Sequence, residues 1–480
     1  MKRLLYTAGA ISLIGLIAYF NLDNILNWRV AQKNKEYVSP KLDTPYIKGQ
    51  YIISFPKDTF KARLFRDSLL FKRFRQINAC NCDASLTLWV APDPETVPPD
   101  MLIQSRKILI PNQKDTAINQ MQQRIRTAEE GSVSHNYLIV QNPPLPYNRF
   151  LKPPSKPVIP PLTNGPQVIV AIVDTGVDPE QEGLGSFLLN TSGSSSICRQ
   201  TEGSYGLNML NSSNSPSNVE PRDRDARLCL TTSTDGHTIW CSYRHGHGTL
   251  INGIIAGLAD YPNRPTVPPQ NAVTLKLLNV KYIEQSSGLS GQQTQGDLFK
   301  ALCGIHYALD RGAKVINASW HVVPIPPSMS TEIRNIFSAT LTKLRSSNAH
   351  LVTSAGNNGS STEIIYPATF SRDPIFGDYV IAVGAWNNNT DTRLTTSNSG
   401  NFVDVYAPGC DITMYHPLIH WWSCTRYQAQ AGTSFATPFV AREVAITKGL
   451  HASFPASQVK SDIISSSALV SSNRVFSPTQ

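Results

Sequence analysis

The stretch QVIVAIVDTGVD, residues 167–178, limits the possible folds of this chain more than any other. Six apolar residues, Val168 to Val173, follow one another without a polar break, and an Asp-Thr-Gly turn comes next. A strand that is apolar at every position is buried on both faces, and such strands belong to parallel sheets covered by helices. The chain therefore needs helices on both sides of this strand.

The required alternation continues along the chain. Runs rich in β-formers at 273–280, 313–320, 350–354 and 378–386 alternate with stretches of helical spacing at 297–312 and 333–347. This order predicts an α/β fold with a parallel sheet and helices on both of its faces. Ligands of such sheets bind at the carboxyl ends of the strands, where Asp174, Ser319 and Asn357 are expected.

The chain before this region has a different texture. Short β-rich runs at 51–55, 85–90, 107–111 and 136–140, with helical spacing inside 115–130, predict a small α+β domain over residues 46–142. Eight prolines follow between Asn142 and Pro161, and they exclude a regular helix or a central strand. Residues 143–165 are therefore a predicted linker, and residues 166–475 a predicted main domain.

The N-terminus carries an export pattern. Lys2 and Arg3 precede an uncharged, largely apolar run from Leu4 to Phe20. As a helix this run would span roughly 25 Å, between the core of a signal peptide and a full membrane span. Residues 1–22 are predicted to be a signal anchor or a signal peptide. The following NLDNILNW lacks the small residues of a cleavage site, which favours the anchor, and residues 23–45 would form a stalk.

Charge and cysteine usage exclude several classes. The net charge is +9, but only 16% of residues are charged and the basic ones are scattered, so no nucleic-acid partner is expected. Eight cysteines without a CxxC pair fit neither a zinc ribbon nor a thioredoxin-like site. Cys229 with Cys241, and Cys410 with Cys424, are near enough in sequence to close surface loops in an oxidising compartment.

A serine near the C-terminus raises the question of catalysis. Ser434 lies in AGTSFATPF, residues 431–439, where it is either a helix cap or a nucleophile. A nucleophilic serine needs an imidazole to take its proton and a carboxylate to orient that imidazole. His247, between two glycines before an apolar run, and Asp174, after the buried strand, are the candidates. Read singly, each also fits a turn or a cap.

Together these motifs resemble the subtilisin-like serine proteases, or subtilases. The resemblance covers roughly residues 165–470 and rests on VAIVDTGVD, GHGTLINGIIAG, SAGNNG and AGTSFATPFVA. It implies Ser434 as nucleophile, His247 as general base and Asp174 as orienting acid, in the chain order known for subtilisin. Asn357 would donate to the oxyanion. The implied substrate-binding residues are Ser319, Trp320, His321 and Gly356.

The resemblance also implies an activity and partners. We expect an exported serine endopeptidase that hydrolyses peptide bonds through an acyl-enzyme and acts on a protein or peptide substrate. No cofactor is required for catalysis, no metal ligand is assigned, and structural calcium would fit the family. Residues 46–142 would be an inhibitory propeptide that the enzyme cuts off within the linker, and an uncleaved N-terminal helix would hold the protein at a membrane.

Other interpretations remain at this stage. His237, Cys241, His245 and His247 could ligate zinc. An α/β-hydrolase would need its acid and histidine after Ser434, where only Glu443 and His451 follow in that order. A subtilase that has lost activity and serves as a binding protein is the third alternative.

Overall fold

The structure of the chain is a computed structural model, and most of the main domain is among the residues that it describes. The described ranges are 45–55, 60–92, 132–141, 150–151, 165–192, 202–210, 220–223, 226–230, 240–244, 246–264, 272–283, 294–322, 324–415, 426–470 and 473–476.

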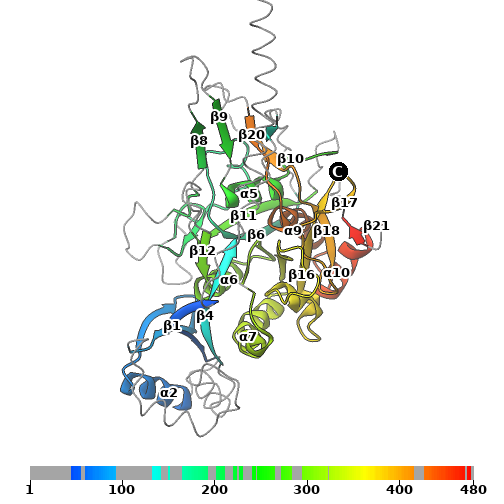
Figure 1. Cartoon of the computed structure of the whole chain (residues 1–480). Helices are drawn as coiled ribbons and strands as arrows, with labels where there is room; N and C mark the ends of the chain where they lie inside the picture. Colours follow the sequence, from blue (N-terminus) through cyan, green and yellow to red (C-terminus); the bar gives the residue numbers. More distant parts are fainter. Residues whose placement is uncertain are drawn as a thin grey trace, which may run out of the picture.

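A largely parallel sheet forms the centre of the main domain (Figure 1). Its strand order is β21-β22-β18-β16-β15-β13-β6-β11-β7, and every neighbouring pair from β18 to β7 is parallel. The strands are β6 (Gln167–Asp174), β7 (Gly206–Asn208), β11 (Thr274–Lys281), β13 (Val315–Ala318), β15 (His350–Ser354), β16 (Val380–Asn387), β18 (Val405–Pro408), β21 (Ala468–Val470) and β22 (Asn473–Val475), with β17 (Thr392–Arg393) antiparallel to β16.

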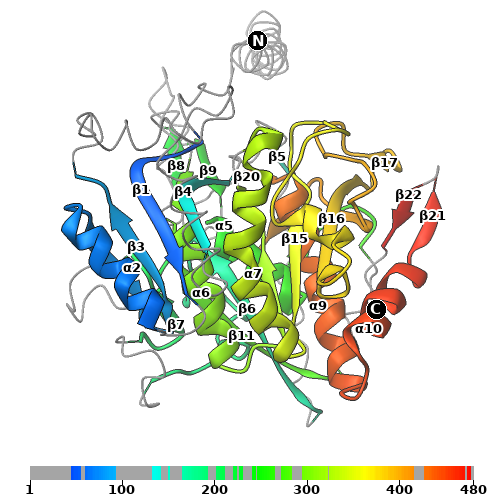
Figure 2. The same ribbon diagram turned by 90° about the horizontal axis from the view of Figure 1, so that it is seen from below.

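Helices cover both faces of this sheet. On one side lie α5 (His247–Ala256) and α9 (Thr433–Leu450), and on the other α6 (Leu298–Asp310) and α7 (Ser330–Ser346), which Figure 2 shows in front of the strands. Strand β6 shows why its sequence is apolar throughout. Val170 and Ile172 pack in the core with α5 and α9, whereas Ala171 and Val173 pack in the core with α6 and α7. The predicted fold class is confirmed.

A second, smaller domain precedes the main one. It consists of β1 (Tyr46–Ser54), β2 (Arg75–Cys80), β3 (Asp83–Val90) and β4 (Ser132–Gln141) in an antiparallel sheet, with α2 (Phe60–Phe71) packed on it. Helix α2 was not predicted from the sequence. The predicted run at 107–111 and helix at 115–130 lie outside the described residues.

The sheet of the small domain continues into the main domain. Strand β4 pairs antiparallel with β1 inside its own domain, and its last residues pair antiparallel with β12 (Thr294–Asp297) and β14 (His321–Val322). Ile139 lies opposite both Gly296 and Val322, so the end of β4 is a central strand between two strands of the main domain. The N-terminal domain therefore lies beside α6 and α7 (Figure 2).

Smaller elements complete the molecule. They are the mixed sheet of β5 (Phe150–Leu151), β20 (Arg426–Gln428), β9 (Trp240–Arg244) and β8 (Ala226–Leu230), the pair β10 (Ala259–Asp260) and β19 (Thr413–Met414), helix α10 (Ala456–Ser465), and the 3-10 turns η2 (Pro327–Met329), η3 (Ala368–Arg372) and η4 (Gly377–Tyr379). In the part of the chain that is described, no helix has the length and apolar character needed to cross a bilayer. The predicted anchor, Leu4 to Phe20, lies outside that part.

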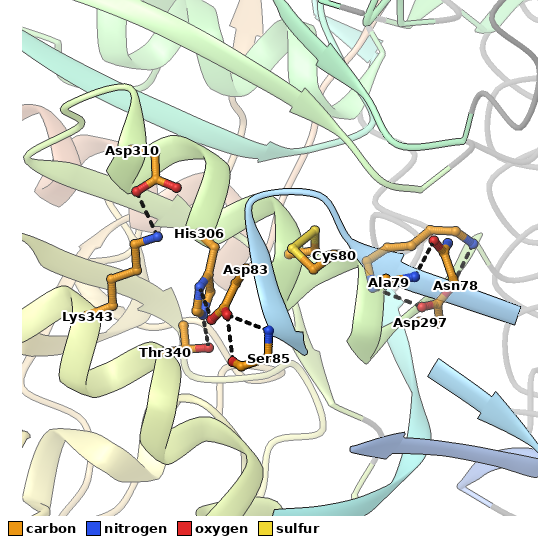
Figure 3. Close-up of a disulfide and its surroundings, with 12 residues drawn as sticks. Asn78, Ala79, Cys80, Asp83, Ser85, Asp297, His306, Asp310, Thr340 and Lys343 are labelled. Carbon is orange, nitrogen blue, oxygen red and sulfur yellow. Dashed lines mark hydrogen bonds and ion pairs between the residues drawn. A yellow bond between two sulfur atoms is a disulfide. The ribbon is translucent and has the colours of Figure 1, made fainter. Parts of the chain in front are cut away.

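A disulfide of the described residues joins two cysteines that the sequence analysis did not pair (Figure 3). Cys80 of the small domain is bonded to Cys303 of α6, across 223 residues of sequence. Cys229 and Cys241 lie directly opposite one another on β8 and β9. Cys424 is outside the described residues. The Cys80–Cys303 pair was not predicted from the sequence, because the fold brings together segments that are distant along the chain.

Candidate active site

Asp174 and His247 meet at the carboxyl end of β6. The His247 Nδ1 atom is 2.8 Å from Asp174 Oδ1, and both side chains are buried. Asp174 Oδ1 also accepts a hydrogen bond from the Thr175 amide at 2.7 Å. A carboxylate next to Nδ1 keeps the proton on that nitrogen, so Nε2 can act as the proton acceptor.

The start of α5 places His247 against this carboxylate. Gly248 is needed because a Cβ atom at its position would lie 2.2 Å from the Gly176 carbonyl oxygen in the turn after β6. Gly246, before His247, has no side chain to cap the helix. The carboxylate of Asp223 caps α5 instead, accepting from the Thr249 amide and hydroxyl at 2.9 Å each. Local glycines and a distant cap thus hold the imidazole at the first helical position.

Ser434 is the second residue of α9, and its surroundings are set by Pro438. A proline at that position has no N–H to donate to the Ser434 carbonyl four residues earlier. The Ser319 hydroxyl donates to that carbonyl at 2.7 Å instead, and the Ser434 hydroxyl donates to the Ser319 carbonyl at 3.0 Å. The ring of Phe435 packs 5.1 Å from the His247 ring, centroid to centroid, so the start of α9 lies next to α5.

Asn357 follows β15 and faces the same helix end. Its Oδ1 accepts from the Thr433 amide at 2.9 Å and the Thr433 hydroxyl at 3.0 Å. Because a backbone amide only donates, these bonds fix which end of the Asn357 side chain is oxygen, and its NH2 group is left for another acceptor. Gly432, with φ of +135°, makes the close turn that brings Thr433 to Asn357.

The other expected substrate-binding residues are more deeply placed. Trp320 is fully buried, donates through Nε1 to the Val173 carbonyl at 3.0 Å and packs edge-on against Tyr282. His321 pairs through its backbone with β4, and burial lowers the pKa of its imidazole. Gly356 precedes Asn357 with φ of +94°. Trp320 is thus part of the core in this structure, whereas the backbone at His321 is part of the β4-binding edge.

The arrangement has the parts of an acyl-transfer site. A serine hydroxyl, a buried His–Asp pair and an amide donor come from α9, α5, β6 and the loop after β15. The backbone N–H of Ser434 is among the first amides of α9, which have no acceptor within the helix. Sequence reasoning missed Asp223 and the role of Ser319 toward Pro438. The proline four residues after Ser434 could have indicated that the Ser434 carbonyl needs a donor from outside the helix, which is the role of Ser319.

The model of the subtilase family matches residues 165–477. The chain belongs to the subtilase family. It is a serine endopeptidase of the subtilisin type by this membership, and the matched range contains each of the site residues described above. The small N-terminal domain lies before the match.

Named subtilases show the same relationship. The chain is 32% identical to subtilisin DY of Bacillus licheniformis over 46% of this chain and 70% of that protein. It is 30% identical to subtilisin of Bacillus pumilus over 47% of this chain and 72% of that protein. A crystal structure of a cold adapted subtilisin-like serine proteinase matches with a TM-score of 0.42 and 19% identity, over 65% of this chain and 89% of that one.

Family membership removes the α/β-hydrolase interpretation. Glu443 and His451 lie on and just after α9 itself, in the same helix region as Ser434. Of the suggested zinc ligands, His237 and His245 are outside the described residues. Among the residues described, the group of metal-ligand atoms is Cys80, Cys82 and Cys303, whose sulfurs do not suit calcium, an ion that prefers oxygen. Structural calcium stays a prediction.

Proposed function

We propose that this subtilase cleaves peptide bonds through Ser434, His247 and Asp174. Ser434 attacks the peptide carbonyl, and His247 takes the hydroxyl proton at Nε2 and then gives it to the leaving amine. Asp174 holds the imidazole and stabilises its charged form. The observation that carries this proposal is the buried contact of 2.8 Å between His247 Nδ1 and Asp174 Oδ1. Water then hydrolyses the acyl-enzyme by the same proton transfers in reverse.

The oxyanion of the tetrahedral intermediate would be held by two donors. Asn357 offers its side-chain NH2, since Thr433 engages its oxygen. The Ser434 amide offers the second donor at the positive end of the α9 dipole. Preorganised donors of this kind stabilise charge that develops only in the transition state. For that reason they lower the barrier rather than merely strengthen substrate binding.

Substrate would bind as an extended strand between β12 and β14. Strand β4 takes this place in the full chain, with Ile139 opposite Gly296 on one side and Val322 on the other. Backbone pairing of this type gives affinity for a peptide without fixing its sequence. The N-terminal domain therefore acts as an inhibitory propeptide that occupies the substrate position, and the protein is made as a zymogen.

Polar contacts at helix starts support this inhibitory role. The His135 amide and ring nitrogen of β4 both bond to Glu332 in the first turn of α7. The Asn136 side-chain oxygen accepts from the Phe299 amide at 3.1 Å, near the start of α6. All of these groups are buried. They support a domain that folds beside α6 and α7 and places its last strand between β12 and β14.

Export is the expected location. The basic N-terminus and the apolar run Leu4–Phe20 favour it, and a disulfide such as Cys80–Cys303 requires an oxidising compartment. We propose that the catalytic domain functions outside the cytoplasm. It stays near the membrane if the N-terminal run is retained, and is secreted if that run is removed.

The test combines an active-site probe with intact mass. The full chain, the Ser434→Ala variant and the Ser466→Ala control are treated with a fluorophosphonate, which labels activated serines. We expect labelling of the wild type and the control only, together with a cut within residues 143–165 in those two chains. If neither labelling nor the cut appears in any chain, the binding-protein alternative replaces the proposal.

A further inference from the structure

The loop that carries Asn357 is held by a buried asparagine from another part of the chain. Residues 355–360, AGNNGS, follow β15 and form neither a helix nor a strand. The buried backbone groups of such a loop need hydrogen-bond partners from outside it. Asn398, which lies after β17 and is fully buried, supplies several of these partners.

On the side before Asn357, Asn398 bonds to two successive carbonyls. Its backbone amide donates to the Gly356 carbonyl at 2.9 Å, and its side-chain Nδ2 donates to the Ala355 carbonyl at 3.0 Å. The approach is close, because a Cβ atom on Gly356 would lie 2.5 Å from that Nδ2 atom. The glycine therefore leaves the space through which the Asn398 side chain reaches the loop.

On the side after Asn357, the same side chain accepts from two amides. The Asn398 Oδ1 atom accepts from the Asn358 amide at 3.1 Å and from the Ser360 amide at 2.9 Å. A backbone amide only donates and a carbonyl only accepts, so these contacts define which end of the Asn398 amide group is oxygen. A side chain has to donate and accept at once to hold both sides of Asn357 in this way.

The central sheet in turn fixes the position of Asn398. Its neighbour Ser397 is also buried, and the Ser397 hydroxyl accepts from the Ala385 amide in β16 at 2.9 Å. The same hydroxyl donates to the Asn398 carbonyl at 3.0 Å. A series of buried hydrogen bonds thus connects the loop of Asn357 to β16.

Asn357 is therefore held through its side chain and through its backbone. Thr433 engages the Oδ1 atom of its side chain, and Asn398 engages the backbone before and after it. A hydrogen-bond donor stabilises a developing oxyanion only from the correct distance and direction. A displacement of about 1 Å can cost about 10²-fold in rate. The position of this loop is thus a condition for the proposed role of Asn357.

We propose that Asn398 is a positioning residue of the oxyanion site. It holds the backbone on both sides of Asn357, so that the NH2 group of Asn357 meets the carbonyl oxygen of the substrate. This inference rests on the proposed function for the role of Asn357. The hold on the loop does not depend on peptidase activity, because all of its hydrogen bonds are made within this chain without substrate.

The first test measures the loop without catalysis. Hydrogen exchange is followed by mass spectrometry in the full chain carrying Ser434→Ala, with and without Asn398→Ala. Asn398→Ala removes the acceptor of the Asn358 and Ser360 amides, so their exchange should be at least about tenfold faster, with little change in α7 and α9. Equal exchange in the two chains would overturn the proposal. Faster exchange in every segment would mean that Asn398→Ala does not fold, and Asn398→Asp then decides.

The second test separates the position of the loop from the stability of the fold. Asn398→Asp keeps the size and the acceptor of the side chain, but it cannot donate to the Ala355 carbonyl and it brings a charge close to Glu363. A recognition sequence for a site-specific protease in residues 143–165 lets every chain be cut alike before kcat and KM are measured with a peptide substrate. We expect kcat to fall about tenfold or more, with little change in KM.

The same change in the Asn357→Ala chain shows whether Asn398 acts through Asn357. With the proposed donor already removed, Asn398→Asp should lower kcat by less than about twofold. Asn388→Asp is the matched control, because Asn388 is half-buried and donates to the Pro262 carbonyl at 3.3 Å in another turn. It should keep the kcat of the wild type. Equal falls in both backgrounds would overturn the proposal and leave Asn398 with a role in general stability.

The two proposals can fail separately. If Ser434→Ala is as active as the wild type, or if neither chain is active, the proposed function fails, and the exchange experiment still decides whether Asn398 holds the loop. If activity depends on Ser434 and Asn357 but not on Asn398, the proposed function stands and this inference is overturned.

Discussion

A proline four residues beyond Ser434 decides how the serine is held. Pro438 cannot donate to the Ser434 carbonyl, and the Ser319 hydroxyl replaces it at 2.7 Å. Ser319 thereby links Ser434, the proposed nucleophile, to the end of β13. At the scale of single residues, a side-chain donor thus supplies the hydrogen bond that a regular helix would make through its backbone.

This link predicts the result of a double-mutant cycle. Ser319→Ala leaves the buried Ser434 carbonyl without a donor and should cost about 1–3 kcal/mol of stability, with a lower kcat. Pro438→Ala restores a backbone N–H that can reach the same carbonyl. We therefore expect Pro438→Ala to change the free energy of unfolding more favourably in the Ser319→Ala chain than in the wild type. Denaturant unfolding of the four chains measures this difference. Equal effects in both chains would show that the two positions are independent.

Asn357 gives a second prediction at this scale. Asn357→Ala removes the proposed oxyanion donor, so kcat should fall by about 10²–10³ with little change in KM. Asn358→Ala is the matched control, because the neighbouring side chain is exposed and donates to Glu363. Kinetics with a peptide substrate measure both. A fall confined to KM would instead place Asn357 in ground-state binding.

Helix α5 carries His247, the proposed base, and the start of this helix depends on a residue from another segment. Asp223 accepts two hydrogen bonds from Thr249 in the first turn of α5. Its negative charge also interacts favourably with the positive end of the helix dipole. At the scale of elements, the position of His247 thus depends on a loop 24 residues earlier in the chain.

Removal of this cap should weaken α5. Asp223→Ala should lower the free energy of unfolding by about 1 kcal/mol and reduce kcat, because the first turn that holds His247 loosens. Asp223→Asn retains an acceptor oxygen and should lose much less. Thermal unfolding and kcat are measured for both variants and compared with the wild type. If Ala and Asn behave alike, the contribution comes from the charge of Asp223 and not from the cap.

The stability of the whole molecule should depend on a buried histidine. His350 begins β15, is fully buried, and its Nε2 lies 3.2 Å from the Ala456 carbonyl at the start of α10. Burial, reinforced by the nearby charge of Lys448, lowers the pKa of His350 to about 3. In the unfolded chain the same imidazole takes up its proton near its usual pKa of 6.5.

The folded chain should therefore lose stability in acid. Between about pH 6.5 and pH 3 the unfolded chain binds a proton that the folded chain does not, so stability falls as the pH falls, by at most about 1.4 kcal/mol per pH unit. His350→Gln should flatten this part of the profile, whereas His451→Gln, at an exposed position, should not. Denaturant unfolding of Ser434→Ala chains between pH 7.5 and 4.5 measures this. Parallel profiles for the parent and His350→Gln would contradict the assignment.

Local patterns in the sequence were sufficient for the main domain. The unbroken apolar run of β6 required a sheet covered on both faces, because the residues from Val168 to Val173 pack against one helix layer or the other, with Ile169 partly buried. The motifs around Asp174, His247, Asn357 and Ser434 could be found because each is contiguous. Their roles in catalysis remain for experiment to test.

Contacts between segments that are distant in the sequence could be found only from the tertiary structure. Cys80 and Cys303 are 223 residues apart, Asp223 caps a helix of another segment, and β4 takes its place between β12 and β14. No local pattern encodes these contacts, because periodicity and turn chemistry act over a few residues. Contacts between distant segments arise when whole elements pack, and that packing places the N-terminal strand β4 between β12 and β14 of the main domain.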